Sequence, residues 1–266
     1  MDTYTDIEFS IDDPVALIRL NRPARLNAFT NRTLREIRSA VNVAAADRRV
    51  VGIVITGEGR GFCAGLDAEE LTRVTSSDKP PEATPEDQVP GLFTYFLEVP
   101  KPIIAALNGV AAGGGLILAL MSDLRFASSA ASLVTVFLKR GLVAEHGSTW
   151  LLPRLVGLGR ALDLLWMSDR ISAEEARELG LVDRVFEPEN LLQSACDYVR
   201  RLAETSPPGA IAETKRLVYR HVGTDYLTAL REAEVSQNRQ VVAPDAGEGA
   251  RAFVEKRAPV FQRIGE

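Results

Sequence analysis

Apolar positions along the chain follow two different patterns on either side of about residue 157. Before that point, short apolar or β-branched runs end in Gly or Asn, as buried strands do. Thr30 can cap a helix between the first two runs, and apolar residues recur on one face of that helix at Leu34, Ile37, Val41 and Ala44. Alternating strands and helices predict a layered α/β core. The predicted strands cover residues 15–20, 50–57, 101–109, 122–128 and 132–138.

The pattern beyond residue 157 is helical. Ser172 and Glu175 have the spacing of a capping box, and Gly180 can end the helix that they begin. A stretch rich in Pro, Ser and acidic residues, 75–91, is more typical of a mobile surface loop than of a domain linker. Successive amphipathic helices are expected at 189–204, 208–220, 225–240 and 247–257.

Composition narrows the class of protein. With 266 residues, 46% of them hydrophobic, the chain can form one large domain or two small ones. Its net charge of -5 argues against a nucleic-acid-binding surface, so any anionic ligand must be held by local positive charge. Cys63 and Cys196 lie far apart and show no metal-ligand spacing, which predicts no metal site and favours a reducing cytoplasm.

Targeting and membrane signals are not recognisable. Residues 1–14 are acidic and lack the basic start and apolar run of a secretory signal. The longest apolar stretch, within 103–121, is interrupted by Asn108 and four glycines, so no membrane span is expected.

Two Gly-rich segments have the local chemistry of an anion site. "GEGRGFCAGLD" (57–67) and "NGVAAGGGLILALMSD" (108–123) each place small residues between a predicted strand and a predicted helix. The first N–H groups of a helix are unpaired, and its dipole is positive there, which suits a developing oxyanion. Either segment alone is weak evidence for a site, since Gly-rich turns are more often simply tight packing.

The order of several motifs is more specific than any one of them. The chain resembles the crotonase superfamily, the enoyl-CoA hydratase/isomerase family, over nearly its whole length. The resemblance implies a core of repeated ββα units over residues 1–200 and a C-terminal helical part, 201–266, used in trimer assembly. It also implies an acyl-CoA thioester substrate with no cofactor, and a homotrimer or a dimer of trimers. The motifs that carry it are "NRPARLNAFT" (21–30), "GFCAGLD" (61–67), "NGVAAGGG" (108–115), "GLVAEHGSTWLLPRLVG" (141–157) and "AFVEKRAPVF" (252–261).

The resemblance also assigns site residues. The two N–H groups of the oxyanion hole would belong to Ala64 and Gly114. The adenine and phosphates of CoA would lie near Arg22, Ala24 and Arg25, with Phe253 and Lys256 serving the CoA of a neighbouring subunit. The rest of the expected substrate contacts are Ala28, Gly65, Leu66, Asp67, Gly113, Ile117 and Phe137.

The acid/base groups decide which reaction is expected. Hydratases of this family use two glutamates, and the corresponding positions here hold Ile117 and Phe137, which cannot orient water or move a proton. Glu145 stands where single-glutamate enoyl-CoA isomerases carry their catalytic base, although "AEH" replaces their "PEG". The best interpretation is therefore one-base isomerisation of an enoyl-CoA. The alternatives are an enoyl-CoA hydratase and an acyl-CoA-binding relative with little catalysis.

Less specific roles compete with the catalytic ones. Glu145 could be a favourable charge near a helix N-terminus, His146 a turn or surface residue, and Ser148 a helix cap. The apolar residues Phe137, Leu142 and Trp150 predict a desolvated Glu145 carboxylate. Structural roles are expected for Cys63, Asp67 and Asp123, and either an acyl wall or a core position for Phe93, Tyr95 and Phe96.

Overall fold

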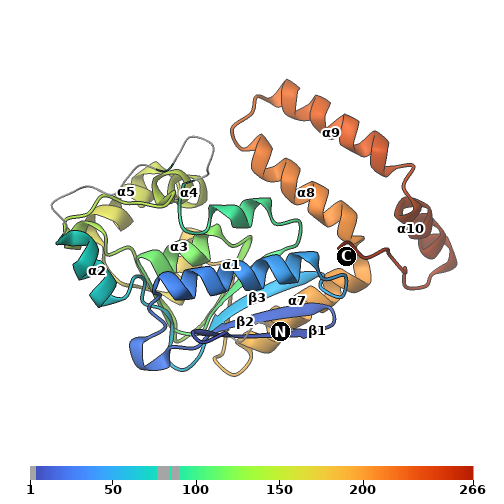
Figure 1. Cartoon of the computed structure of the whole chain (residues 1–266). Helices are drawn as coiled ribbons and strands as arrows, with labels where there is room; N and C mark the ends of the chain where they lie inside the picture. The colour runs from blue at the N-terminus through green and yellow to red at the C-terminus, as the bar shows by residue number, and fades with distance from the viewer. Residues whose placement is uncertain (1–3, 77–83, 85–89, 266) are drawn as a thin grey trace.

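The strands in the described part of the chain form two sheets, one of six strands and one of four. Figure 1 shows how the chain is arranged around them. The computed structural model describes residues 4–76, 84 and 90–265. The larger sheet begins with an antiparallel pair, β1 (Ile7–Asp12) and β2 (Val15–Leu20), and continues in parallel through four further strands. These are, in order, β3 (Gly52–Gly57), β5 (Ile103–Leu107), β7 (Leu124–Ser128) and β10 (Arg184–Phe186).

The smaller sheet has the order β4 (Gly61–Cys63), β6 (Val110–Ala112), β8 (Ser132–Val134) and β9 (Ile171–Ser172). Three of its strands, β4, β6 and β8, directly follow β3, β5 and β7 along the chain, whereas the fourth, β9, precedes β10. A helix follows two of the strand pairs directly: α2 (Ala68–Thr75) after β4 and α3 (Gly114–Met121) after β6. This repetition confirms the predicted ββα units of an α/β fold.

Helices cover both faces of the larger sheet. Alternate strand residues point to opposite sides, so Ile53 and Ile103 pack in the cluster of α1 (Asn31–Ala46), whereas Val54 and Ile104 face α7 (Leu191–Thr205). The predicted apolar face of α1 is confirmed, because Ile37, Val41 and Ala44 are buried. Thr30 and Thr33 form a capping box at the start of this helix: the side chain of each accepts a hydrogen bond from the backbone N–H of the other.

Several predicted boundaries needed correction. The strand expected at 132–138 ends at Val134, because Val136 has a left-handed φ of +56° and residues 138–140 form a 3-10 turn. The division at residue 200 between the core and the C-terminal helical part stays a prediction; residue 200 itself lies in α7, the helix Leu191–Thr205. The predicted loop at 75–91 begins at the last residue of α2, and its residues 77–83 and 85–89 lie outside the described residues.

The helices predicted at 172–180, 189–204, 208–220, 225–240 and 247–257 are confirmed, whereas the sequence pattern gave no range for two further helices at 148–156 and 158–167. Ser172 and Glu175 form a capping box on α6 (Ala173–Leu179), which Gly180 ends with a φ of +85°. Upstream of it lie α4 (Ser148–Val156) and α5 (Leu158–Met167). After α7 the chain leaves the sheet and forms an arm of three helices, α8 (Pro208–His221), α9 (Tyr226–Gln240) and α10 (Pro244–Glu255), which projects from the body (Figure 1). None of the helices in the described ranges has the length and hydropathy of a membrane span.

Candidate active site

A cavity of about 300 Å³ opens where the two Gly-rich segments meet the start of α1 and the segment before α4. Its walls are mainly apolar, with Phe29, Leu66 and Phe137 among them. Gly113 and Gly114 contribute backbone at one place, and Glu145 and His146 contribute polar side chains at another. The structure thus brings together three of the predicted groups: the Gly-rich helix start, the Leu66 turn and Glu145.

Gly114 supplies a backbone donor to this cavity. It is the first residue of α3, so its N–H has no acceptor inside the helix. The N–H of Gly113, by contrast, donates to the Val134 carbonyl oxygen at 3.0 Å. A Cβ atom on Gly114 would lie 2.5 Å from the Phe29 ring, so only glycine fits here without displacing Phe29. The structure supports Gly114 as one of the two donors.

The second donor is Leu66, and the prediction of Ala64 is wrong. The Ala64 N–H already donates to the Leu26 carbonyl oxygen at 3.0 Å, and Ala64 does not line the cavity. Leu66 lines the cavity, and its N–H has no acceptor in the described part of the chain. A Cβ atom on Gly65 would lie 3.2 Å from the Gly114 nitrogen, which places the turn of Leu66 directly beside the start of α3.

Backbone pairing with Phe29 explains why Leu66 is the free donor. Phe29 donates its N–H to the Gly65 carbonyl at 2.8 Å, and its own carbonyl accepts from the Asp67 N–H at 3.0 Å. These two bonds bracket Leu66 and leave its N–H pointing away from Phe29, as alternation in a parallel bridge requires. The sequence motif predicts the turn, but not which of its residues pairs with Phe29.

Glu145 lies in a turn just before α4. Its side chain is 48% exposed, and its one polar contact among the described residues is His146 Nε2, 3.5 Å from Oε1. Phe137 and Leu142 share the cavity with it, but Trp150 does not. The prediction of a desolvated carboxylate is therefore wrong, because half of the side chain meets solvent.

His146 and Ser148 have distinct structural roles. His146 adopts a left-handed φ of +53° in the turn, and its ring lines the cavity beside Glu145. Ser148 is the first helical residue rather than the predicted cap, since Gly147 holds that position. The Ser148 hydroxyl donates to the Glu145 carbonyl oxygen at 2.8 Å and so fixes the backbone of the turn.

The two positions that hold carboxylates in hydratases have apolar side chains here. Ile117 is fully buried within α3 and does not line the cavity. Phe137 lines it but offers no proton-transfer group. Glu145 is the one carboxylate among the described residues that line the cavity.

The predicted CoA contacts divide into two groups. Arg22 and Arg25 line a second, polar hollow of about 300 Å³ together with Asp67, and the exposed Ala24 lies on the same short turn. Ala28 is buried, and its carbonyl oxygen accepts a hydrogen bond from Arg22.

Phe253 and Lys256 form the other group. They lie at the end of α10, on the opposite side of the molecule from α2 (Figure 1). Phe253 is 85% exposed. Within one chain these two residues stand apart from the cavity, so their predicted role depends on a neighbouring subunit.

The residues expected to be structural are structural. Cys63 is fully buried, and desolvation raises the pKa of its thiol to about 12, which keeps it protonated and unreactive. Asp123 accepts hydrogen bonds from the Ile103 N–H, Lys215 and Tyr219 and so anchors α8 to the sheet. Phe93 and Phe96 belong to the core, and sequence reasoning missed their neighbour Leu92, which lines the cavity.

Asp67 caps α2, as its position in the turn predicted. Its Oδ1 accepts the Glu69 N–H at 3.1 Å, and its Oδ2 meets Arg22 Nη2 at 3.1 Å. Burial alone would raise the pKa of Asp67, but the hydrogen bonds from Glu69 and Arg22 and the nearby positive charge outweigh it and lower the pKa. Asp67 is therefore an ionised structural anchor beside Leu66.

Comparison with known proteins places this fold and cavity in a class of acyl-CoA enzymes. Residues 10–263 match the family described as enoyl-CoA hydratase/isomerase. The chain is 34% identical over 253 residues to the 1,2-epoxyphenylacetyl-CoA isomerase of Escherichia coli, a match that covers 94% of this chain and 96% of that protein. The chain belongs to the enoyl-CoA hydratase/isomerase family.

Solved structures agree with this placement. The crystal structure of enoyl-CoA hydratase subunit I from Geobacillus kaustophilus aligns with a TM-score of 0.85 at 35% identity, covering 97% of this chain and 98% of that one. An enoyl-CoA hydratase from Polaromonas sp. aligns with a TM-score of 0.87 at 30% identity, covering 96% and 99%. Relatives named isomerase and relatives named hydratase are therefore similarly close to this chain.

Proposed function

We propose that this protein moves the double bond of an enoyl-CoA thioester, with Glu145 as the single base. The observation that carries the proposal is the cavity itself, which combines two free N–H donors, from Leu66 and Gly114, with one carboxylate. The E. coli relative is also named an isomerase of an acyl-CoA thioester, although its named substrate is an epoxide rather than an enoyl-CoA.

The proposed reaction has two proton transfers, both through Glu145. The thioester oxygen accepts hydrogen bonds from Leu66 and Gly114 while Glu145 removes a proton from the carbon next to the carbonyl. The electron pair moves into an enolate whose negative charge rests on that oxygen, and protonated Glu145 then returns the proton two carbons further along the chain. No water or other co-reactant is consumed.

The two donors matter most when the charge develops. Removing one such donor typically costs about 2.7 to 4 kcal/mol of transition-state stabilisation. The dipole of α3 adds positive potential at Gly114, because that residue is at the N-terminus of the helix. Glu145, half exposed at the wall of the cavity, is the group that accepts the proton.

Hydration is less well supported. Addition of water by two carboxylates needs a second acid/base group, and the positions that would supply it hold the apolar Ile117 and Phe137. A protein that merely binds acyl-CoA is disfavoured by Glu145, since pure binding gives no reason for a carboxylate beside the oxyanion donors.

Substrate binding and assembly follow from the same proposal. Arg25 and Ala24, on an exposed turn beside the polar hollow, would contact the nucleotide end of CoA, and no separate cofactor is required. Phe253 and Lys256 would complete the site of a neighbouring subunit in a trimer or a dimer of trimers. Exposed apolar residues on the helical arm, such as Tyr226, Leu227 and Val235, support such an assembly.

Glu145→Gln tests the proposal, because Gln has the shape of Glu but cannot take up the proton. We expect kcat for isomerisation of a 3-enoyl-CoA to fall by on the order of 100-fold to 10,000-fold, the usual contribution of a general base, with KM changed little. Glu178→Gln, an exposed glutamate on α6, is the control and should keep full activity. Full turnover in Glu145→Gln would contradict the proposal.

A further inference from the structure

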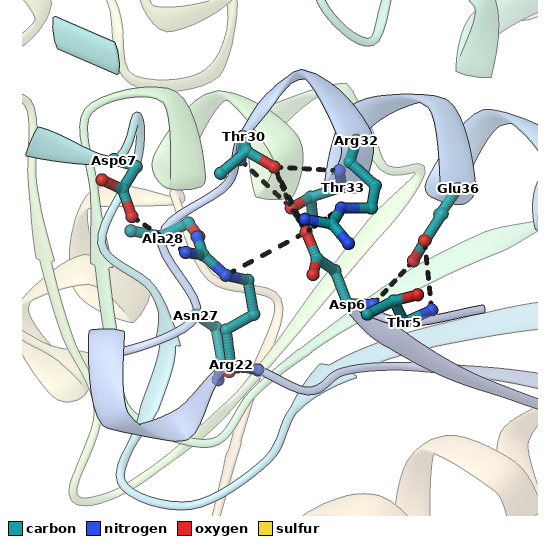
Figure 2. Close-up of polar contacts among 10 residues, drawn as sticks. All are labelled: Thr5, Asp6, Arg22, Asn27, Ala28, Thr30, Arg32, Thr33, Glu36 and Asp67. Carbon is teal, nitrogen blue, oxygen red and sulfur yellow. Dashed lines mark hydrogen bonds and ion pairs between the residues drawn. The ribbon is translucent and has the colours of Figure 1, made fainter. Parts of the chain in front are cut away.

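A cluster of charged side chains surrounds Arg22 (Figure 2), and its members Arg22, Asp6 and Asp67 do not line the cavity. Arg22 is at its centre, between two carboxylates that are both largely buried: Asp6 at 4.0 Å and Asp67 at 3.1 Å. The Arg22 Nη1 also donates to the Ala28 carbonyl oxygen. Only 22% of the Arg22 side chain is exposed, so most of its donors already serve the protein.

The contacts of Arg22 fall on the two segments that hold the Leu66 N–H. Ala28 immediately precedes Phe29, and Asp67 immediately follows Leu66. Phe29 and Leu66 are themselves joined by the backbone bridge that leaves the Leu66 N–H free. One guanidinium group therefore clamps both sides of this bridge, which the planar fork of arginine can do and a lysine cannot.

The same clamp reaches the second donor through Phe29. The Phe29 ring lies so close to Gly114 that an added Cβ atom would come within 2.5 Å of it. A shift of the Phe29 segment would therefore move the Leu66 turn and also change the packing under Gly114. The relative position of the two N–H groups depends on the place of Phe29.

Asp6 holds the far side of Arg22. Its Oδ2 accepts from the Thr33 hydroxyl at 2.6 Å and from the Thr30 hydroxyl at 3.2 Å, both at the start of α1 (Figure 2). Arg32 approaches the same oxygen at 3.9 Å but touches neither Ala28 nor Asp67. Asp6, the residue just before β1, thus links Arg22 by an ion pair to the start of α1.

We infer that Arg22 is a positioning residue that sets the separation and direction of the Leu66 and Gly114 donors, rather than a contact for CoA. The inference rests on the proposed function, since it assumes that these donors hold the thioester oxygen. It replaces the role that sequence resemblance gave to Arg22. A misplacement of about 1 Å at a reacting centre can cost on the order of 100-fold in rate, so a loosened clamp should act on the transition state.

The test compares Arg22→Gln with wild type on two thioesters of the same acyl group: the full CoA ester and the pantetheine ester, which lacks the nucleotide. We expect kcat to fall by about tenfold to 100-fold on both esters, with KM changed less than about threefold, because positioning affects the transition state more than the bound substrate. Arg32→Gln, which removes the other arginine beside Asp6, is the matched control and should leave both parameters unchanged.

A spectroscopic readout separates positioning from a general loss of structure. The infrared carbonyl stretch of bound butyryl-CoA, a saturated thioester that cannot isomerise, falls in frequency when N–H groups donate to the oxygen. We expect Arg22→Gln to reduce this shift while the melting temperature shows that the protein stays folded. If Arg22→Gln does not fold, Asp67→Asn breaks the same ionic contact, keeps a capping oxygen on α2, and should give the same kinetic and infrared changes.

The opposite results would overturn the inference. A higher KM for the CoA ester alone, with normal kcat and no effect on the pantetheine ester, would make Arg22 a nucleotide contact. An unchanged carbonyl shift would also contradict it. If wild type shifts the carbonyl but isomerises no enoyl-CoA, the proposed function fails while the role of Arg22 is still decided by the infrared comparison.

Discussion

Phe29, Gly65 and Gly114 fit together so closely that the oxyanion donors depend on their exact shapes. Gly65 has a φ of +90°, and a Cβ atom on it would lie 2.8 Å from the Ala112 carbonyl oxygen. Gly114 leaves room for the Phe29 ring. Both glycines are therefore required by conformation or by close contact rather than by flexibility.

Gly114→Ala should disrupt catalysis more than folding. The new methyl group must displace Phe29, and overpacking of this kind typically costs about 1–3 kcal/mol of stability. Because Phe29 also brackets Leu66, we expect kcat to fall by on the order of 100-fold, as for loss of an oxyanion donor.

Kinetics and thermal unfolding of Gly114→Ala measure both effects. Gly209→Ala is the control, since nothing lies within 4 Å of the added Cβ atom in α8 and the change should be neutral or slightly stabilising. Unchanged kcat in Gly114→Ala would show that Phe29 does not position the donors.

Single residues of the site could be predicted from sequence only where the chemistry is local. Glu145 is a carboxylate within a recognisable motif, and the structure places it in the cavity. Ala64 was wrong because the choice between Ala64 and Leu66 depends on hydrogen bonds to Leu26 and Phe29, which lie more than 30 residues away. The positive charge of Arg22 is evident from the sequence. Its contacts with the buried carboxylates Asp6 and Asp67 are not, because these residues come together only in the folded chain.

At the scale of elements, the longer strands and the capped helices could be predicted. The strands at β2, β3, β5 and β7 are apolar runs of five or six residues, and α1 and α6 carry caps that the structure shows. The strands β4, β6, β9 and β10 have two or three residues, too few for any periodicity. The strand β1 was missed although Ile7, Phe9 and Ile11 alternate with polar residues.

The pairing of α8 with α9 should weaken in acid. Glu213 on α8 accepts from Arg216 and from the Ser236 hydroxyl on α9, and these bonds lower the pKa of Glu213 from its usual 4.5 to about 2. A lowered pKa in the folded state stabilises the protein above about pH 4.5, and this stabilisation is lost as the pH falls toward 2.

Glu213→Gln should therefore lower the melting temperature at pH 7 and have a smaller effect at pH 3. Thermal unfolding of both proteins at the two pH values measures the difference. An equal destabilisation at pH 7 and pH 3 would show that the charge of Glu213 does not stabilise the arm.

The whole molecule has an uneven distribution of apolar surface. The helical arm exposes Leu227, Leu230 and Val235 on α9, Val242 just after it, and Phe253 on α10. No residue of this arm lines the cavity of its own chain. Exposed apolar groups on a projecting part are typical of protein–protein interfaces and agree with the proposed assembly, although α5 also exposes apolar side chains.

Leu230→Glu should dissociate that assembly, because it places a charge on an apolar interface. Sedimentation velocity should give a particle of three 29.0 kDa chains, or a multiple of three, for wild type and a smaller one for the variant. If Phe253 and Lys256 serve the neighbouring subunit, KM for the CoA ester should rise in the dissociated variant. A wild-type protein that sediments as a single chain would contradict the assembly.

Incubation of the wild-type protein in deuterated water, separately with a 3-enoyl-CoA and a 2-enoyl-CoA, tests the central claim most directly. One-base isomerisation by Glu145 predicts that the 3-enoyl ester gains the ultraviolet absorbance of a conjugated thioester. It also predicts that the 2-enoyl ester gains no mass of water. Mass spectrometry follows the 2-enoyl ester. A gain of one water would mean that the cavity catalyses hydration and that a single carboxylate beside Leu66 and Gly114 suffices for it.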